Sequence, residues 1–162
     1  MTSEALMSET FAAVSLGVVA TLFLFAFWFS PGGVLALRRR AGELQPDVRL
    51  GYSTQTLYRV LEAYGDEGRR SFRRLLLGDM IFPAIYGALL YSLGGLLARE
   101  PMSSIAQHAA IAAAAFDYAE NVFLLIVLRR FPFRSSALAR LASICTSLKM
   151  VAIAVSVVSL LK

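Results

Sequence analysis

The sequence predicts an all-α, polytopic membrane protein: a four-transmembrane-helix antiparallel bundle with an interfacial amphipathic helix between the first and second spans. The chain of 162 residues is 57% hydrophobic and has a mean hydropathy of +0.64, too apolar for an ordinary soluble domain. Four apolar runs are long enough to cross a bilayer. The arginines cluster beside these runs, as expected for topology control and anionic headgroups, so nucleic acid is not a predicted partner.

The first predicted span covers residues 11–30, a run without any charge. The residues before it include Glu4 and Glu9 but no Lys or Arg. A signal peptide needs a basic start and a small-residue cleavage site, and neither is present. Pro31 and two glycines then end the span. We therefore expect this run to be a transmembrane helix.

A polar region rich in arginine follows, and within it residues 53–74 are predicted to form the amphipathic helix. Ser53 or Thr54 can cap its start. The apolar positions that follow recur at helical spacing: Leu57, Val60, Leu61, Tyr64, Gly68, Phe72 and Leu75. Such a helix is expected to lie in the headgroup plane, with a short soluble helical hairpin as the alternative.

The remaining predicted spans cover residues 75–98, 105–128 and 138–161. Pro83 cannot donate a hydrogen bond to the carbonyl of Asp79, so the second span should be kinked there. The small residues of 109–115 in the third span should allow close helix contact. We expect residues 1–162 to form a single integral membrane domain.

The distribution of basic residues predicts the orientation of these spans. Nine arginines lie between Arg38 and Arg74, and four lie between Arg129 and Arg140. With four spans, both groups fall on the same side of the bilayer. The positive-inside rule places them in the cytoplasm and both termini outside, in the cell (inner) membrane. Anionic headgroups at the cytoplasmic face are therefore predicted partners.

Polar side chains inside the third span are the strongest functional signal. Asp117, Glu120 and Asn121 have i, i+3, i+4 spacing, so a helix places them on one face. Carboxylates at this depth are expensive unless they face protein, water or a partner. The alternative is a structural polar knot between helices, but such hydrogen bonds contribute only about 0.6 kcal/mol on average.

Depth estimates from the helical rise predict which other side chains meet this face. Lys149 and Glu120 each lie roughly 13 Å from the basic end of their helices, so they should sit at the same level. Asp79 should lie nearer the cytoplasmic mouth, and Tyr86 just beyond Glu120. The predicted pocket has Asp117, Glu120 and Asp79 as catalytic candidates, and Tyr86, Asn121 and Lys149 as substrate-binding candidates.

Other kinds of site receive little support. The single Cys145 cannot form a disulfide within the chain or a zinc site. A carboxylate metal site lacks a histidine at the right depth, since His108 is near the outer end of its helix, so no metal is predicted. No cofactor is predicted either. Trp28 is expected to be a belt aromatic at the bilayer interface.

Three functional hypotheses follow, and the first leaves open whether the protein is an enzyme. The first is an intramembrane acidic pocket that binds a lipid-like or hydrophobic small molecule, and could transform it by carboxylate acid/base chemistry. The second is a proton-coupled transporter or channel that works as an oligomer, most simply a homodimer. The third is a membrane scaffold or accessory protein whose basic cytoplasmic loop recruits anionic lipid or a partner.

Overall fold

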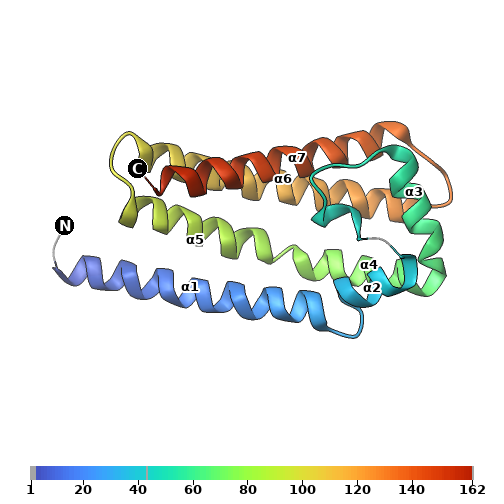
Figure 1. Cartoon of the computed structure of the whole chain (residues 1–162), viewed down its shortest axis with the longest axis horizontal. Coiled ribbons are helices and arrows are strands. Elements are labelled where there is room, and N and C mark those ends of the chain that lie inside the picture. The colour runs from blue at the N-terminus through green and yellow to red at the C-terminus, as the bar shows by residue number, and fades with distance from the viewer. Residues whose placement is uncertain (1–2, 43, 162) are drawn as a thin grey trace.

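A computed structural model of the chain describes residues 3–42 and 44–161. All regular elements in this part are helices (Figure 1). Four helical stretches are long and apolar enough to cross a membrane, at Ser3–Ala41, Gly65–Leu97, Met102–Arg130 and Ser136–Ser159, as the sequence predicted. They indicate a membrane protein.

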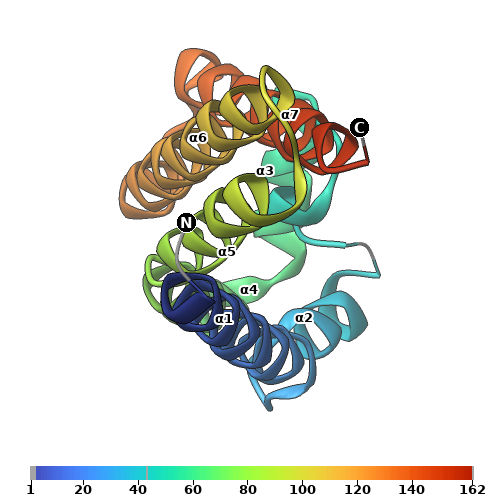
Figure 2. The ribbon, with the colours of Figure 1, turned by 90° about the vertical axis from the view of Figure 1, so that its left-hand side faces the viewer.

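Helix α1, Ser3–Phe29, lies along helix α5, Phe82–Leu97, on one side of the molecule (Figures 1 and 2). The helix that contains the predicted first span begins eight residues before it, at Ser3. The early residues include good helix formers, and Glu4 in the first turn faces the positive end of the helix dipole. Most side chains of α1 are exposed to the surroundings.

Helix α6, Met102–Arg130, and helix α7, Ser136–Ser159, form the tightest helix pair of the fold. Both lie within a few residues of the predicted third and fourth spans. Helix α5 packs against α6 through small residues: a Cβ placed on Gly87 would come within 3.1 Å of Ala114 Cβ. The expected close contact of the alanine-rich run is thereby confirmed.

The polar region between the first two spans folds into several short elements. They are helix α2 (Val34–Ala41), a 3-10 turn η1 (Pro46–Val48), helix α3 (Thr54–Ala63) and helix α4 (Gly65–Asp79). The predicted single helix over 53–74 is wrong. Gly65 takes a left-handed conformation, with φ of +60°, and this breaks the helix between α3 and α4.

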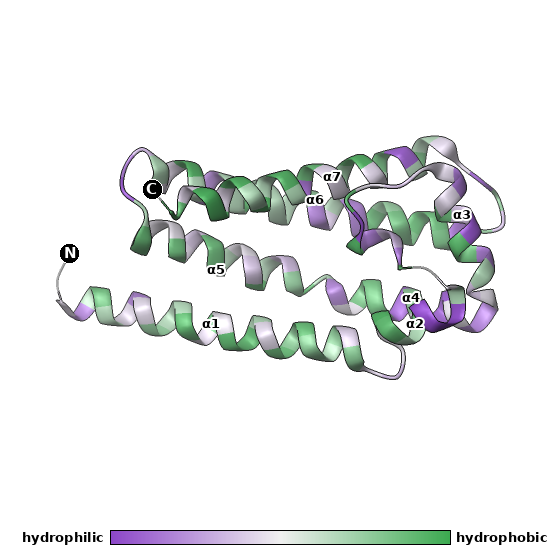
Figure 3. Ribbon diagram, viewed as in Figure 1, coloured by the Kyte–Doolittle hydropathy of each residue, from purple (hydrophilic) through white to green (hydrophobic). Residues whose placement is uncertain are grey.

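The apolar faces of α3 and α4 are buried within the protein. Leu57, Leu61 and Phe72 form one core with Leu124 of α6 and Ala142 of α7. Helix α4 continues toward α5, so the second candidate stretch, Gly65–Leu97, joins the arginine-rich α4 to the apolar run predicted as the second span (Figure 1). The two helices are interrupted at Met80 and Ile81, where Pro83 in the first turn of α5 was expected to cause a kink. The hydrophilic residues gather at the end of the molecule that holds α2, α3 and α4 (Figure 3).

Candidate functional site

Three neighbouring elements place five of the six predicted site residues in one cluster. Asp79 ends α4, beside the break before α5. Asp117, Glu120 and Asn121 lie on the buried face of α6, as their spacing required. Lys149 lies on the facing side of α7 and is also buried. The sequence therefore anticipated this grouping, although its functional role stays a prediction.

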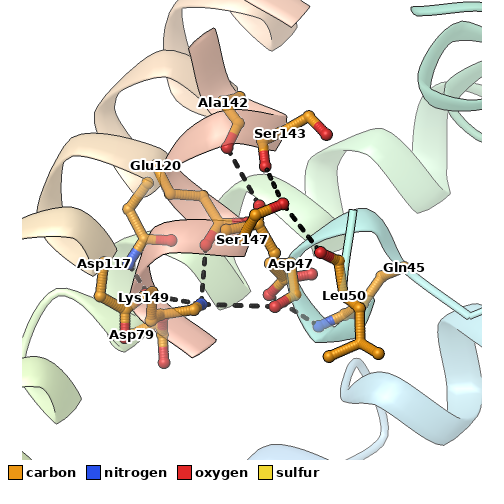
Figure 4. Close-up of polar contacts among 12 residues, drawn as sticks. Gln45, Asp47, Leu50, Asp79, Asp117, Glu120, Ala142, Ser143, Ser147 and Lys149 are labelled. Carbon is orange, nitrogen blue, oxygen red and sulfur yellow. Dashed lines mark hydrogen bonds and ion pairs between the residues drawn. The ribbon is translucent and has the colours of Figure 1, made fainter. Parts of the chain in front are cut away.

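Lys149 is the centre of this cluster (Figure 4). Its Nζ lies 3.0 Å from Asp117 Oδ1 and 2.7 Å from Glu120 Oε2. It also donates to the backbone carbonyl of Asp47, at 3.4 Å. One ammonium thus links α6, α7 and the segment before α3, and a buried charge is tolerated only with partners of this kind.

Glu120 has a second partner on α7. The hydroxyl of Thr146 donates to Glu120 Oε1 at 2.5 Å, and it is also within 3.0 Å of the carbonyl of Ala142. Thr146 and its neighbour Cys145 are both buried. Glu120 has no exposed surface, so it is fully enclosed between α6 and α7.

Asp79 and Asn121 join α4 to α6 at the edge of the cluster. The Asn121 amide donates to Asp79 Oδ2 at 2.9 Å, and both side chains are buried. This bond was not foreseen as a specific pair. It holds the Asp79 carboxylate next to the helix break, where it faces the cleft described below.

The structure adds Asp47 and Gln45, which sequence reasoning missed. Gln45 donates to Asp47 Oδ2 at 3.0 Å, and both side chains are buried. Two hydrogen bonds fasten this segment to α7. Ser147 Oγ donates to the Leu50 carbonyl at 2.9 Å (Figure 4), and the Tyr52 N–H donates to Ser143 Oγ at 2.9 Å. Asp47 lies in a short 3-10 turn between longer elements, so no periodic pattern in the sequence marks it as buried.

Burial perturbs the acid/base properties of this segment. Loss of solvent raises the pKa of the Asp47 carboxyl well above its usual value, and the nearby Glu120 charge raises it further, while Lys149 acts in the opposite direction. Burial likewise raises the pKa of Tyr52, with a smaller contribution from Glu120. Burial thus disfavours the charged form of Asp47 unless a cation accompanies it.

The acids outnumber the cations in the described part of this cluster. Asp47, Asp79, Asp117 and Glu120 are all buried, and Lys149 is the cation that contacts two of them. A low-dielectric site does not hold several uncompensated carboxylates. The cluster must therefore keep protons on some of these acids or receive positive charge from a bound molecule.

A cleft of about 660 Å³ opens beside the cluster, between α1 and α7. Its polar end is formed by Asp47, Asp79, Asp117 and Lys149. Its walls are mainly apolar, with α1, α5 and α7 contributing Leu24, Phe27, Trp28, Phe82, Leu89, Leu90, Met150 and Ile153 among others. Such a combination of apolar walls and a few converging polar groups is typical of a small-molecule site.

The predicted site residues differ in their access to this cleft. Tyr86 lines it, together with Asp79, Asp117 and Lys149, whereas Glu120 and Asn121 lie behind these residues and do not line it. Trp28, expected only as a belt aromatic, is also part of the wall. His108 is remote from the cluster, where its ring contacts the carbonyl of Ser104 one turn earlier on α6.

Comparison with known proteins provides no relative for this chain: no protein-family model matches it, and neither do the curated proteins or the solved structures.

Proposed function

We propose that the protein binds a lipid-like small molecule within the membrane, with the polar end of the molecule at the acidic cluster. The observation that carries this proposal is the cleft, which joins a long apolar wall to three buried carboxylates and a lysine. A molecule with a hydrophobic chain would cover the wall, and its functional group would meet the carboxylates. Helix α1, which packs mainly on α5 and α2, leaves the cleft open on the side toward α7.

The arrangement supports acid/base chemistry on such a molecule. Asp117 and Asp79 line the cleft and are the groups that would exchange a proton with the ligand. Lys149 would stabilise negative charge, and Tyr86 would position the functional group. Glu120 and Asn121 would not touch the ligand. Glu120 would position Lys149 through their ion pair, and Asn121 would position Asp79 through its hydrogen bond. An isomerisation, a cyclisation or a hydrolysis would each use groups of these types.

The membrane setting belongs to the same proposal. The arginines of α2 and α4 and those in the last turn of α6 would face the cytoplasm, so that both termini would lie on the outer side of the cell membrane. The four spans would form an antiparallel bundle, and α3 would lie at the inner interface with its polar face outward and its apolar face in the protein core. The cleft would then be reached from the cytoplasmic half of the bilayer, where anionic headgroups gather near the basic residues.

Native mass spectrometry of gently purified protein tests this function. Wild type should retain a specific amphiphile, and a variant carrying Asp117→Asn with Glu120→Gln should not. Glu9→Gln is the matched control, because Glu9 is an exposed carboxylate on α1 outside the cleft. Equal retention by wild type and the double variant, with both folded, would contradict the proposal.

A proton-coupled transporter acting as an oligomer is the second candidate, and the excess of buried acids over cations favours it. Proton-carrying carboxylates are the chemistry that such transport needs. Reconstituted vesicles separate the two functions. A pH-driven solute flux that is lost in Asp117→Asn would favour transport, and retention of an amphiphile without any flux would favour the first candidate.

A further inference from the structure

Two of the buried carboxylates differ from the others in their partners. Asp117 and Glu120 share the Lys149 ammonium. Among the described residues, the Asp47 and Asp79 side chains instead accept hydrogen bonds from the neutral amides of Gln45 and Asn121. Within residues 3–42 and 44–161, neither forms an ion pair, yet both line the cleft.

Unsatisfied polar atoms point to a missing partner at the same place. Asp47 Oδ1 and the Tyr86 hydroxyl are buried and have no hydrogen-bond partner among the described residues. Both side chains are more than nine-tenths buried and both line the cleft. Buried polar atoms in native proteins are almost always paired, so we infer that a molecule bound in the cleft pairs with these two atoms. That group must donate a hydrogen bond to a carboxylate, or offer a positive charge.

The wall next to these acids is aromatic. Trp28 of α1 and Phe82 and Tyr86 of α5 all line the cleft, and the Phe82 and Tyr86 rings lie 5.3 Å apart at a tilt of 56°. Aromatic faces attract organic cations through their quadrupoles, and tryptophan does so most strongly. Acids and aromatic rings together form the usual surroundings of a bound ammonium group.

We propose that the cleft selects an amphiphile with an ammonium headgroup, held between Asp47 and Asp79, with its hydrophobic chain along α1 and α5. This inference rests on the proposed function and names its ligand class. The headgroup supplies a direct cationic partner to two carboxylates that form no ion pair among the described residues. An organic cation fits better than a metal ion, because no group of three or more potential ligands in the described residues could hold a metal. The cleft volume lies within the usual range of about 300–1,000 Å³ for small-molecule sites, which suits one small amphiphile.

Three probes with the same number of carbon atoms test which headgroup the cleft prefers: dodecylammonium, dodecanol and dodecanoate. The full chain, in neutral dodecyl maltoside micelles, is titrated with each, and bound probe is counted by native mass spectrometry. Dodecylammonium should bind at least about tenfold more tightly than the alcohol or the carboxylate. Asp47→Asn and Asp79→Asn should each weaken it by about tenfold, with Glu9→Gln unchanged. Circular dichroism checks that each variant is folded.

The outcomes separate this inference from the function on which it rests. Equal binding of the alcohol, or tighter binding of the carboxylate, would overturn the ammonium assignment and leave amphiphile binding standing. Absence of saturable binding for all three probes would overturn both. The comparison of the three probes on wild type decides the question even if an Asn variant does not fold. Added phosphatidylethanolamine identifies the source of the natural ammonium ligand. Displacement of bound dodecylammonium would assign that ligand to a membrane lipid, and no displacement would assign it to a separate amphiphile. Both results support an ammonium headgroup in the cleft.

Discussion

The Lys149 ammonium lies 2.7 Å from the Glu120 carboxylate, and both side chains are buried between α7 and α6. The pair sits at the level of the break between α4 and α5, where Asp79 also reaches the cluster through Asn121. Helices of a membrane bundle gain little hydrophobic stabilisation from one another, because lipid chains are as apolar as leucine. A buried ion pair can therefore decide which faces of α6 and α7 meet.

Replacing Lys149 with methionine should destabilise the protein strongly. The change leaves Asp117 and Glu120 buried without their cation, and loss of one partner of a buried ion pair typically costs about 3–5 kcal/mol. Arg140→Met is the matched control on the same helix, because Arg140 is exposed; its effect should stay within about 0.5 kcal/mol. Denaturant titration in detergent, followed by circular dichroism, measures both. Equal stability of the two variants would show that the acids around Lys149 are already neutral.

The stability of the wild type should fall as pH rises through the titration of Asp47. Burial raises its pKa in the folded state, so the folded state binds more protons than the unfolded state, whose Asp pKa is about 3.9. Stability is greatest below that value and declines above it, at up to about 1.4 kcal/mol per pH unit, until the folded-state pKa is passed.

Asp47→Asn should remove this part of the pH dependence, because the amide does not titrate. Melting temperatures in detergent, measured from about pH 4 to pH 8, give the slope for both proteins. The variant should be the more stable protein at the upper end of this range. A variant that keeps the full wild-type slope would show that another group carries the proton.

Gly87→Val should loosen the contact between α5 and α6. A Cβ at Gly87 would already lie 3.1 Å from Ala114 Cβ, so two further methyl groups require the helices to separate. Overpacking of this kind costs typically about 1–3 kcal/mol. The control is Gly78→Val on α4, since a Cβ there meets nothing within 4 Å. Thermal unfolding of the two variants side by side checks the difference, and equal melting temperatures would refute the tight contact.

Much of the helical framework could be predicted from residue patterns. The predicted third span, 105–128, became α6 at Met102–Arg130, because a long apolar run has few alternatives to a helix in lipid. The match in depth between Lys149 and Glu120 followed from the regular rise of two helices, and the salt bridge agrees with it. The prediction of one helix over 53–74 failed in the polar region, where Gly65 separates α3 from α4.

The amino-acid sequence by itself determined the four apolar spans, the polar face of Asp117, Glu120 and Asn121, and the level at which Lys149 meets it. These features depend on local composition and on helical period, which a single segment carries. Only the tertiary structure decided that Asp47 joins the cluster and that α1 forms a wall of the cleft. It also decided that Glu120 and Asn121 lie behind the residues that line the cleft. Those outcomes depend on contacts between distant segments, such as Ser147 with Leu50, whose free energies no local pattern records.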